Sequence, residues 1–285
     1  MADELDAATE TLVITPEIWS QQMVDYVYSS PVMMNRVHRV DREIVAMGSK
    51  INLPQMPALT VGDVTATTGA VANQSATYTE IELTIDKWRY NAVTLVNKAG
   101  IQANRDILAD FRRAYPDALM ADVDAKLMAL HGDITTYTQG DANTQPNEDL
   151  MTATVADLLG ANLGNRMRDP NQVTFFLHTN LWKYLKKIAG WVDACVTGEA
   201  VGGRQKLELP NLYGIPVLLS SQIVSSSGRR NFLCLKEVFA LGIQKGIDIQ
   251  EIPIDALAKK IAASVLYGVK AYNEARGVKI TTVAA

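Results

Sequence analysis

A long alternating run at residues 77–96 limits most strongly what this chain can fold into. Apolar side chains alternate with polar ones through Ile81 and Leu83, and the alternation resumes one position out of phase at Trp88. A period of two predicts a half-buried strand, and a phase slip indicates a bulge or a sharp twist. One strand of this length would reach roughly 65 Å, whereas a compact chain of 285 residues has a radius of gyration of about 19 Å. We therefore expect the strand to leave the body as an arm that lies on another molecule.

The residues before this run supply a partner strand. Residues 44–61 are extended, because Ile51 and Leu53 alternate, and Pro54 confines the segment to an edge or an exposed ribbon. Residues 62–76 are small and polar. Two extended segments around such a tip predict a long hairpin, and a lone hairpin is at best marginally stable in water. Contacts outside the hairpin must therefore stabilise it.

The strongest helical pattern covers residues 103–131. Apolar residues recur every three or four positions from Leu108 to Leu130, and Gly132 follows the last of them. Pro116 lies inside the pattern and removes one backbone donor, which predicts a kink or a break. A helix of this length would measure about 43 Å, so it is expected to form the spine of a domain.

Beyond residue 150 the pattern changes to short alternating elements. The predicted elements are a helix at 154–167, a strand at 173–177, a helix from Thr179, and strands at 215–219 and 232–235. Residues 264–282 return to extended character, with one turn at 274–277. This order predicts an α+β fold with a small module inserted between the spine and the closing strands.

The charge distribution is uneven along the chain. Residues 1–35 carry six acidic residues and no Lys or Arg, whereas the rest of the chain is close to neutral. The lack of a basic stripe argues against a direct grip on nucleic acid. No apolar run approaches the ~18 residues of a membrane-spanning helix, so no membrane contact is expected. We expect the acidic segment to dock on bases near the closing strands, with Lys259, Lys260, Lys270, Arg276 and Lys279 as the richest candidates.

No arrangement of residues predicts catalysis. His38, His131 and His178 are far apart, and none has a partner at metal-ligand spacing. Cys195 is better explained as a small half-buried apolar residue than as a nucleophile. No glycine-rich phosphate loop occurs. We therefore predict no enzymatic activity, no metal site and no cofactor.

Five segments in a fixed order carry a resemblance to a known family. They are PEIWSQQMVDYVYSSPVM at 16–33, KINLPQMPALTVGDV at 50–64, YTEIELTIDKWRYNAVTLVNKAG at 78–100, NRDILADFRRAYPDALMADVDAKLMAL at 104–130 and YGVKAYNEARGVKI at 267–280. The series resembles the major capsid protein of tailed bacteriophages, with the Hong Kong 97-like fold. The resemblance implies an N-terminal arm at 1–43, an extended loop at 44–96, a peripheral domain at 97–149 and 256–285, and an axial domain at 150–255.

The same resemblance implies partners and a location. Many copies, as pentamers and hexamers, would form an icosahedral shell around double-stranded DNA, without sequence-specific binding, in a virion assembled in the host cytoplasm. Only about fifteen residues precede the first predicted helix, so a separate scaffolding protein is expected, together with a portal and an optional cementing or decoration protein. The residues expected at subunit contacts are Asp3, Glu4, Asp6, Glu10, Asp63, Asn73, Tyr78, Glu80, Lys259 and Lys260.

Two alternatives stay open. A bacterial encapsulin has the same fold and a similar length, but its compartment has no portal vertex and does not mature. A cytosolic α+β enzyme that dimerises through the hairpin would instead elute near twice the chain mass of 31.2 kDa. Particle images and gel filtration separate these alternatives from a capsid protein.

A shell of this chain is predicted to lack covalent cross-links. An isopeptide bond needs an amine nucleophile, and residues 51–86 contain no lysine. Lys50 and Lys87 stand at the base of the loop, roughly 40 Å from its tip. Boiled and reduced particles should therefore run as a single band near 31.2 kDa, whereas a ladder of multiples would contradict this prediction.

Overall fold

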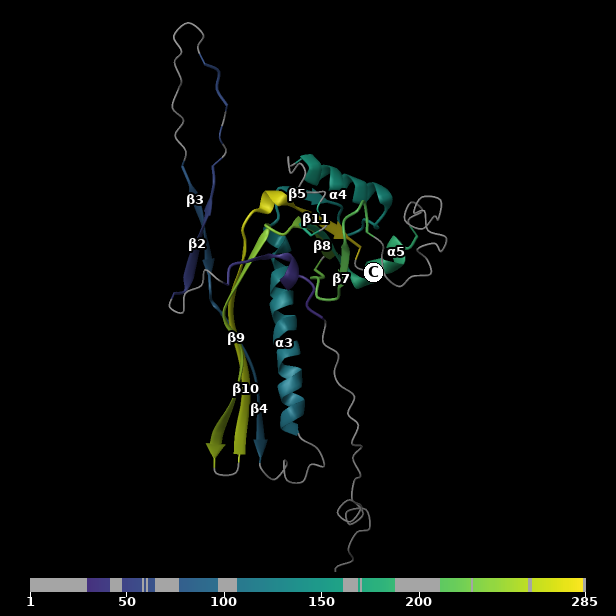
Figure 1. The fold of residues 1–285 in the computed structure, drawn as a ribbon. Helices are drawn as coiled ribbons and strands as arrows, with labels where there is room; N and C mark the ends of the chain where they lie inside the picture. Colours follow the sequence, from purple (N-terminus) through teal and green to yellow (C-terminus); the bar gives the residue numbers. More distant parts are fainter. Residues whose placement is uncertain are drawn as a thin grey trace, which may run out of the picture.

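The computed structural model describes residues 30–41, 48–57, 59, 61–64, 77–96, 107–160, 169, 171–187, 211–226, 228–255 and 258–283. These residues form helices together with sheets of mixed pairing, so the α+β prediction is confirmed. Figure 1 shows an elongated body, a rounder part beside its upper end, and a two-stranded hairpin that projects beyond both.

The elongated body is a four-stranded sheet in the order β1-β9-β10-β4. Its strands are β1 (His38–Arg39), β9 (Phe239–Asp255), β10 (Ala258–Ala271) and β4 (Lys87–Val96). The long strands pair antiparallel, and β1 pairs parallel with β9. The sequence analysis predicted no strand at β9, because register shifts against β10 interrupt its alternation.

Helix α3 (Ile107–Ala129) covers one face of this sheet. Its apolar stripe, which includes Tyr115, Leu119 and Val123, is buried in the core. Tyr267 of β10 is also buried and donates its hydroxyl hydrogen to Asp122 Oδ2 of α3 at 3.0 Å. Of the kink or break predicted at Pro116, the break is wrong, because α3 runs through Pro116 without interruption. Burial of this stripe against the sheet offsets the loss of one backbone hydrogen bond.

The rounder part is a five-stranded sheet in the order β5-β11-β8-β6-β7. Its strands are β5 (Tyr137–Gln139), β11 (Gly277–Thr282), β8 (Arg229–Leu235), β6 (Val173–His178) and β7 (Val217–Ser220), with α4 (Glu148–Gly160), η4 (Thr179–Leu181) and α5 (Trp182–Leu185) beside them. Every residue of β6 is buried, and its Phe176 ring stacks on Phe232 of β8 at 5.0 Å between centroids. One continuous apolar cluster joins this sheet to α3 and β10, so the two parts share a core.

The sheets do not follow the predicted division of the chain. Strand β9 lies within the predicted axial range 150–255 but pairs with β10 of the elongated body. Strands β5 and β11 lie in the predicted peripheral ranges but pair with each other and, through β8, join the rounder part. Helix α4 begins at Glu148, six residues before the predicted helix. No helix among the described residues combines the length and apolar character needed to cross a membrane.

The hairpin consists of β2 (Lys50–Gln55) and β3 (Thr79–Thr84), which pair only with each other. Two residues separate the end of β3 from the start of β4, and β4 pairs with β10. The predicted single strand over 77–96 is therefore wrong. The phase slip in the sequence marks the place where the chain leaves the hairpin and joins the body.

Gly268 of β10 lies where the body meets the hairpin. A Cβ atom there would stand 2.3 Å from the carbonyl oxygen of Thr84. Because the obstacle is backbone, Gly268→Ala should destabilise the protein by about 1–3 kcal/mol. The matched control is Gly246→Ala in β9, where a Cβ meets no atom within 4 Å. Chemical denaturation measures both variants, and equal midpoints would contradict a close approach at Gly268.

Candidate assembly surfaces

The hairpin has one polar and one apolar face near its root. Lys50 Nζ lies 2.9 Å from Glu82 Oε1, and the amide of Asn52 donates to Glu80. On the opposite face Leu53 and Leu83 are buried in a small cluster with Val40 and Ala240. The alternation in the sequence thus places leucines against the body and an exposed charge ladder outside.

The charge ladder includes one clear electrostatic effect. The hydrogen bond from Lys50 is the largest influence on Glu82 and lowers the pKa of its carboxyl, although the Glu82 side chain is exposed. Salt screens such exposed pairs, so the ladder contributes little to stability. Within the ladder, the Lys50 amine at the base of the loop donates a hydrogen bond to Glu82.

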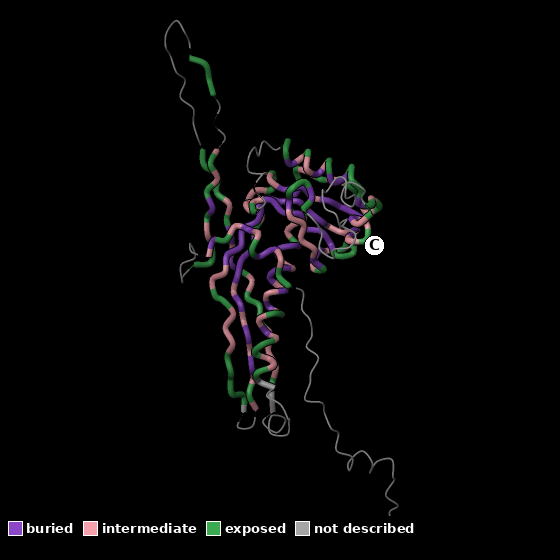
Figure 2. Tube along the Cα trace, turned by 45° about the vertical axis from the view of Figure 1, so that its right-hand side comes forward, coloured by how far each residue is buried: buried purple, intermediate pink, exposed green. Residues whose placement is uncertain are grey.

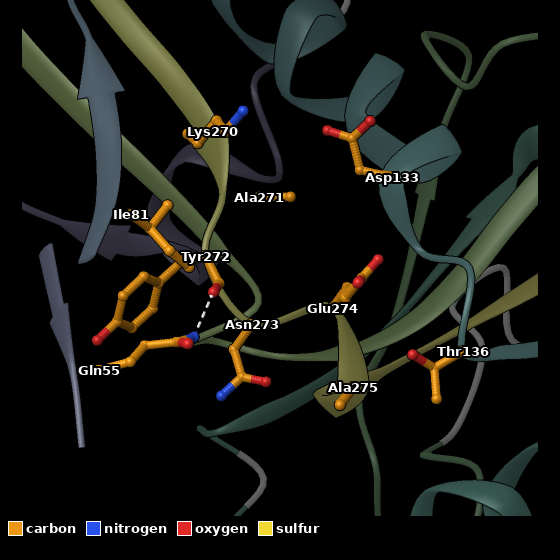
Figure 3. Close-up of a pocket in the computed structure, with 10 residues that line it drawn as sticks. All are labelled: Gln55, Ile81, Asp133, Thr136, Lys270, Ala271, Tyr272, Asn273, Glu274 and Ala275. Atoms are coloured by element: carbon orange, nitrogen blue, oxygen red, sulfur yellow. Dashed lines mark hydrogen bonds between the residues drawn. The ribbon is translucent and has the colours of Figure 1, made fainter. Parts of the chain in front are cut away.

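Tyr272 holds the hairpin root on the body. Its hydroxyl donates to the carbonyl of Pro54 at 3.0 Å, and its own carbonyl accepts from Gln55 Nε2 at 2.9 Å. The ring of His38 stacks on the tyrosine ring at 6.3 Å between centroids. Beside this anchor lies a cleft of about 410 Å³. Figure 3 shows its wall between Gln55 and Ile81 of the hairpin and the turn that follows β10.

The first exposed apolar surface is the distal hairpin. Here the large apolar side chains are all more than half exposed, and Val61 is 100% exposed; they are Met56, Leu59, Val61, Val64 and Tyr78. Figure 2 shows exposed residues along the hairpin above its root. Within the described part of one chain, nothing covers this surface, which we name the hairpin tip surface.

The second exposed apolar surface lies on the elongated sheet. Trp88 and Tyr90 of β4 are 73% and 74% exposed. Arg89, between them in sequence, points to the other face and lies 3.4 Å from Asp122 of α3. Because side chains alternate between faces, the two aromatic rings stand on the face that α3 does not cover. Ile252 of β9 is also exposed and is opposite Lys260 of β10, which is opposite Thr94 of β4.

We name the surface defined by Trp88, Tyr90 and Ile252 the sheet face. The sequence showed the alternation of β4, but not which face of the strand a helix would cover. Which face of β4 is covered depends on how α3 packs on the sheet. The sequence pattern of α3 specifies only which stripe of the helix is buried.

The predicted contact residues are spread over the molecule. Asp63, Tyr78 and Glu80 are exposed on the hairpin, and Glu80 accepts a hydrogen bond from Asn52. The other hairpin and arm residues, Asp3, Glu4, Asp6, Glu10 and Asn73, lie outside the described residues. The structure therefore leaves the predicted contacts of the acidic arm as predictions.

The predicted basic docking residues do not form one patch. Lys259 and Lys260 lie at the start of β10, whereas Lys270 lies at its other end, roughly 33 Å away along an extended strand. Arg276 forms an ion pair with Glu237. The docking of the acidic segment on one or more of these bases stays a prediction.

Two of the histidines considered as catalytic groups lie in buried or partly buried structural positions. Burial lowers the pKa of His131, and its Nδ1 lies 3.0 Å from the carbonyl of Met128. Burial also lowers the pKa of His178, whose ring accepts from the amide of Asn180. Cys195 lies outside the described residues, and the other cysteine, Cys234, is buried, which raises the pKa of its thiol. No group of three or more His, Cys, Asp or Glu residues suited to a metal occurs among the described residues.

Comparison with known proteins finds relatives by structure alone. No family model matches the sequence, and no curated protein matches it significantly. A solved structure from Mycobacterium phage Che8 is similar with a TM-score of 0.78 and 19% identity, over 94% of this chain and 97% of that one. The mature capsid of bacteriophage PhiM1 gives 0.75 and 11%, over 95% and 93%. The capsid of a native GTA particle gives 0.74 and 13%, over 99% and 100%.

These similarities cover nearly the whole of each chain. The protein therefore has the Hong Kong 97-like fold of tailed-phage capsid structures, as the order of its sequence segments predicted. The identities are low, so the fold depends on shared patterns of burial and pairing rather than on shared motifs.

Tyr272→Phe tests the anchor of the hairpin. The variant keeps the ring but loses the hydrogen bond to Pro54, a loss of about 0.5–1.5 kcal/mol. We expect faster hydrogen exchange in β2 and little change elsewhere. The control Tyr213→Phe removes a hydroxyl that bonds Thr152 on the rounder part. Unchanged exchange in β2 of the Tyr272 variant would mean that this bond does not hold the hairpin.

Proposed function

We propose that this chain is a major capsid protein whose copies assemble into a closed icosahedral shell. One observation carries the proposal: a single chain exposes two apolar surfaces, the hairpin tip surface and the sheet face, that point in different directions. The hairpin projects away from the body in Figure 1, so its tip cannot fold back on its own sheet. The shared fold with subunits of phage and GTA capsids supports the same conclusion.

Such a pair of surfaces favours head-to-tail assembly. When the hairpin of one copy lies on the sheet face of the next, each copy both gives and receives one contact. Contacts of this kind close into rings when the rotation between copies allows it, as pentamers and hexamers require. Apolar burial contributes roughly 25 cal/mol per Å², so exposed groups such as Val61 and Trp88 are stabilised by a neighbour rather than by their own chain.

The proposal includes a revised division of the chain. Residues 1–43 are the N-terminal arm, and the extended loop is 48–86 rather than 44–96, since β4 pairs with β10. The peripheral domain comprises α3, β4, β9 and β10, and the axial domain comprises α4, α5 and the five-stranded sheet. This division assigns the five-stranded sheet to one domain and the three long strands of the four-stranded sheet to the other, while β1 joins the N-terminal arm to that sheet.

The proposed shell has partners outside this chain. It encloses double-stranded DNA without reading its sequence, since the chain has no basic stripe. A separate scaffolding protein and a portal take part in assembly in the host cytoplasm, and a cementing protein can add stability. The shell is part of a virion, and the chain performs no catalysis.

Electron microscopy of purified particles tests this function. A capsid precursor has a portal vertex and matures, whereas an encapsulin shows neither feature. A dimeric enzyme forms no particles and elutes near twice 31.2 kDa at every concentration. Closed shells with one distinct vertex are the expected result, and a stable dimer would overturn the proposal.

Two variants test the two surfaces separately. Val61→Asp places a charge on the hairpin tip surface, and the double variant Trp88→Ala with Tyr90→Ala removes the aromatic rings of the sheet face. Because these side chains are exposed in one chain, both variants should keep the wild-type melting temperature. Both should lose closed particles under conditions in which the wild type forms them.

Matched controls change other large apolar residues that are more than half exposed. Leu159→Asp on α4 and Tyr213→Ala are exposed apolar sites of the rounder part. Hydrogen exchange adds a second measurement: residues 61–64 should be unprotected in free chains and protected in particles. Normal particle yield from both test variants would exclude a contact between these surfaces.

A further inference from the structure

Asp124, near the C-terminal end of α3, is a carboxylic acid buried inside the protein. Its side chain has no solvent-exposed surface. Its Oδ1 accepts a hydrogen bond from the backbone amide of Met33 at 2.8 Å. The neighbouring amides of Val32 and Met34 also favour the charged carboxylate and so lower its pKa. Its Oδ2 is buried and has no hydrogen-bond partner among the described residues. An unpartnered buried carboxylate oxygen is unusual in a folded protein.

The three amides belong to the segment by which the N-terminal residues join the body. Met33, Met34 and Val37 are buried, whereas Pro31 is exposed. The amides precede or begin the short helix η1 (Met34–Arg36), whose N-cap residue supplies no side-chain acceptor. The first amides of a helix have no partner within it. Asp124 supplies that partner from α3, 91 residues away in the chain.

The two protonation states of Asp124 fit this position differently. As a carboxylate it places a negative charge in the interior, where desolvation disfavours charge. As a neutral acid it still accepts from Met33 at Oδ1 and buries no charge. Desolvation is the larger influence and raises the pKa of Asp124, although the three amides oppose it.

No charged side chain nearby contributes to this shift among the described residues. On α3 itself, Asp122 is engaged by Tyr267 and Arg89, and Lys126 does not act on Asp124. On the segment that packs against it, Arg36 of η1 does not act on it either. The shift in the pKa of Asp124 therefore comes from its burial, which raises the pKa, and from the backbone amides of residues 32–34, which lower it.

We propose that Asp124 is a proton-sensitive latch that holds the root of the N-terminal segment, residues 32–37, on the spine helix more firmly in acid than at neutral pH. A group whose pKa is raised by docking favours docking in its protonated form. This contribution is complete below the ordinary pKa of aspartate and is lost as the pH rises through the raised value. The latch acts within one chain, so it stands independently of shell formation.

Hydrogen exchange of the full-length chain tests the latch directly. Protection factors of the amides in 32–34, corrected for the intrinsic effect of pH, are compared between about pH 5 and pH 8. In the wild type they should be several-fold higher in acid. Asp124→Asn keeps an acceptor for Met33 without a titrating group, so its protection should not depend on pH. Asp117→Asn, an exposed site on the same helix, should behave as the wild type.

Asp124→Ala completes the test, because it removes the acceptor and should lower protection of 32–34 at both pH values. The isosteric Asn variant decides the matter if the Ala variant does not fold. Wild-type protection that is the same at both pH values would overturn the proposal. So would a pH dependence that survives in Asp124→Asn, which would assign the response to another group.

Discussion

A two-stranded hairpin cannot bury its own apolar side chains, and this constraint governs the rest of the molecule. Near the root, the body buries the apolar side chains of the hairpin: Leu53 and Leu83 pack against Val40 and Ala240. Gly268 also allows β10 to approach the backbone of Thr84. Beyond the root no described residue of the chain covers the hairpin tip surface, and Val61 stays fully exposed. A rigid base with an unsatisfied tip is a structure that projects an apolar surface toward a neighbour.

The body gives this projection a fixed direction. A continuous apolar cluster runs from α3 through β10 into the five-stranded sheet, so the two sheets are packed on one core. Helix α3 uses its buried stripe on one face of the elongated sheet and leaves Trp88 and Tyr90 on the other. An exposed aromatic face on a stiff sheet is suited to receive an exposed apolar hairpin, and the proposed assembly follows from that complementarity.

Electrostatic interactions have two distinct roles in this structure. Exposed ion pairs such as Lys50 with Glu82 lie on the surface of the hairpin and are weakened by salt. Asp124 is different, because it is buried and accepts a hydrogen bond from the backbone amide of Met33 in a distant segment. The first kind adjusts contacts at the surface, whereas the second links the protonation of the core to the attachment of the N-terminal segment.

The sequence by itself determined the local structure and the order of the parts. Alternation predicted the hairpin strands, the periodic stripe predicted α3, and the series of segments predicted the capsid fold. Tertiary structure alone decided that the chain changes sheets between Thr84 and Lys87, that β9 joins the long sheet, and that Trp88 faces away from α3. It also decided that Asp124 meets Met33. The physical reason is that periodicity records which side chains share a face, whereas strand pairing and helix packing across long separations choose what covers that face.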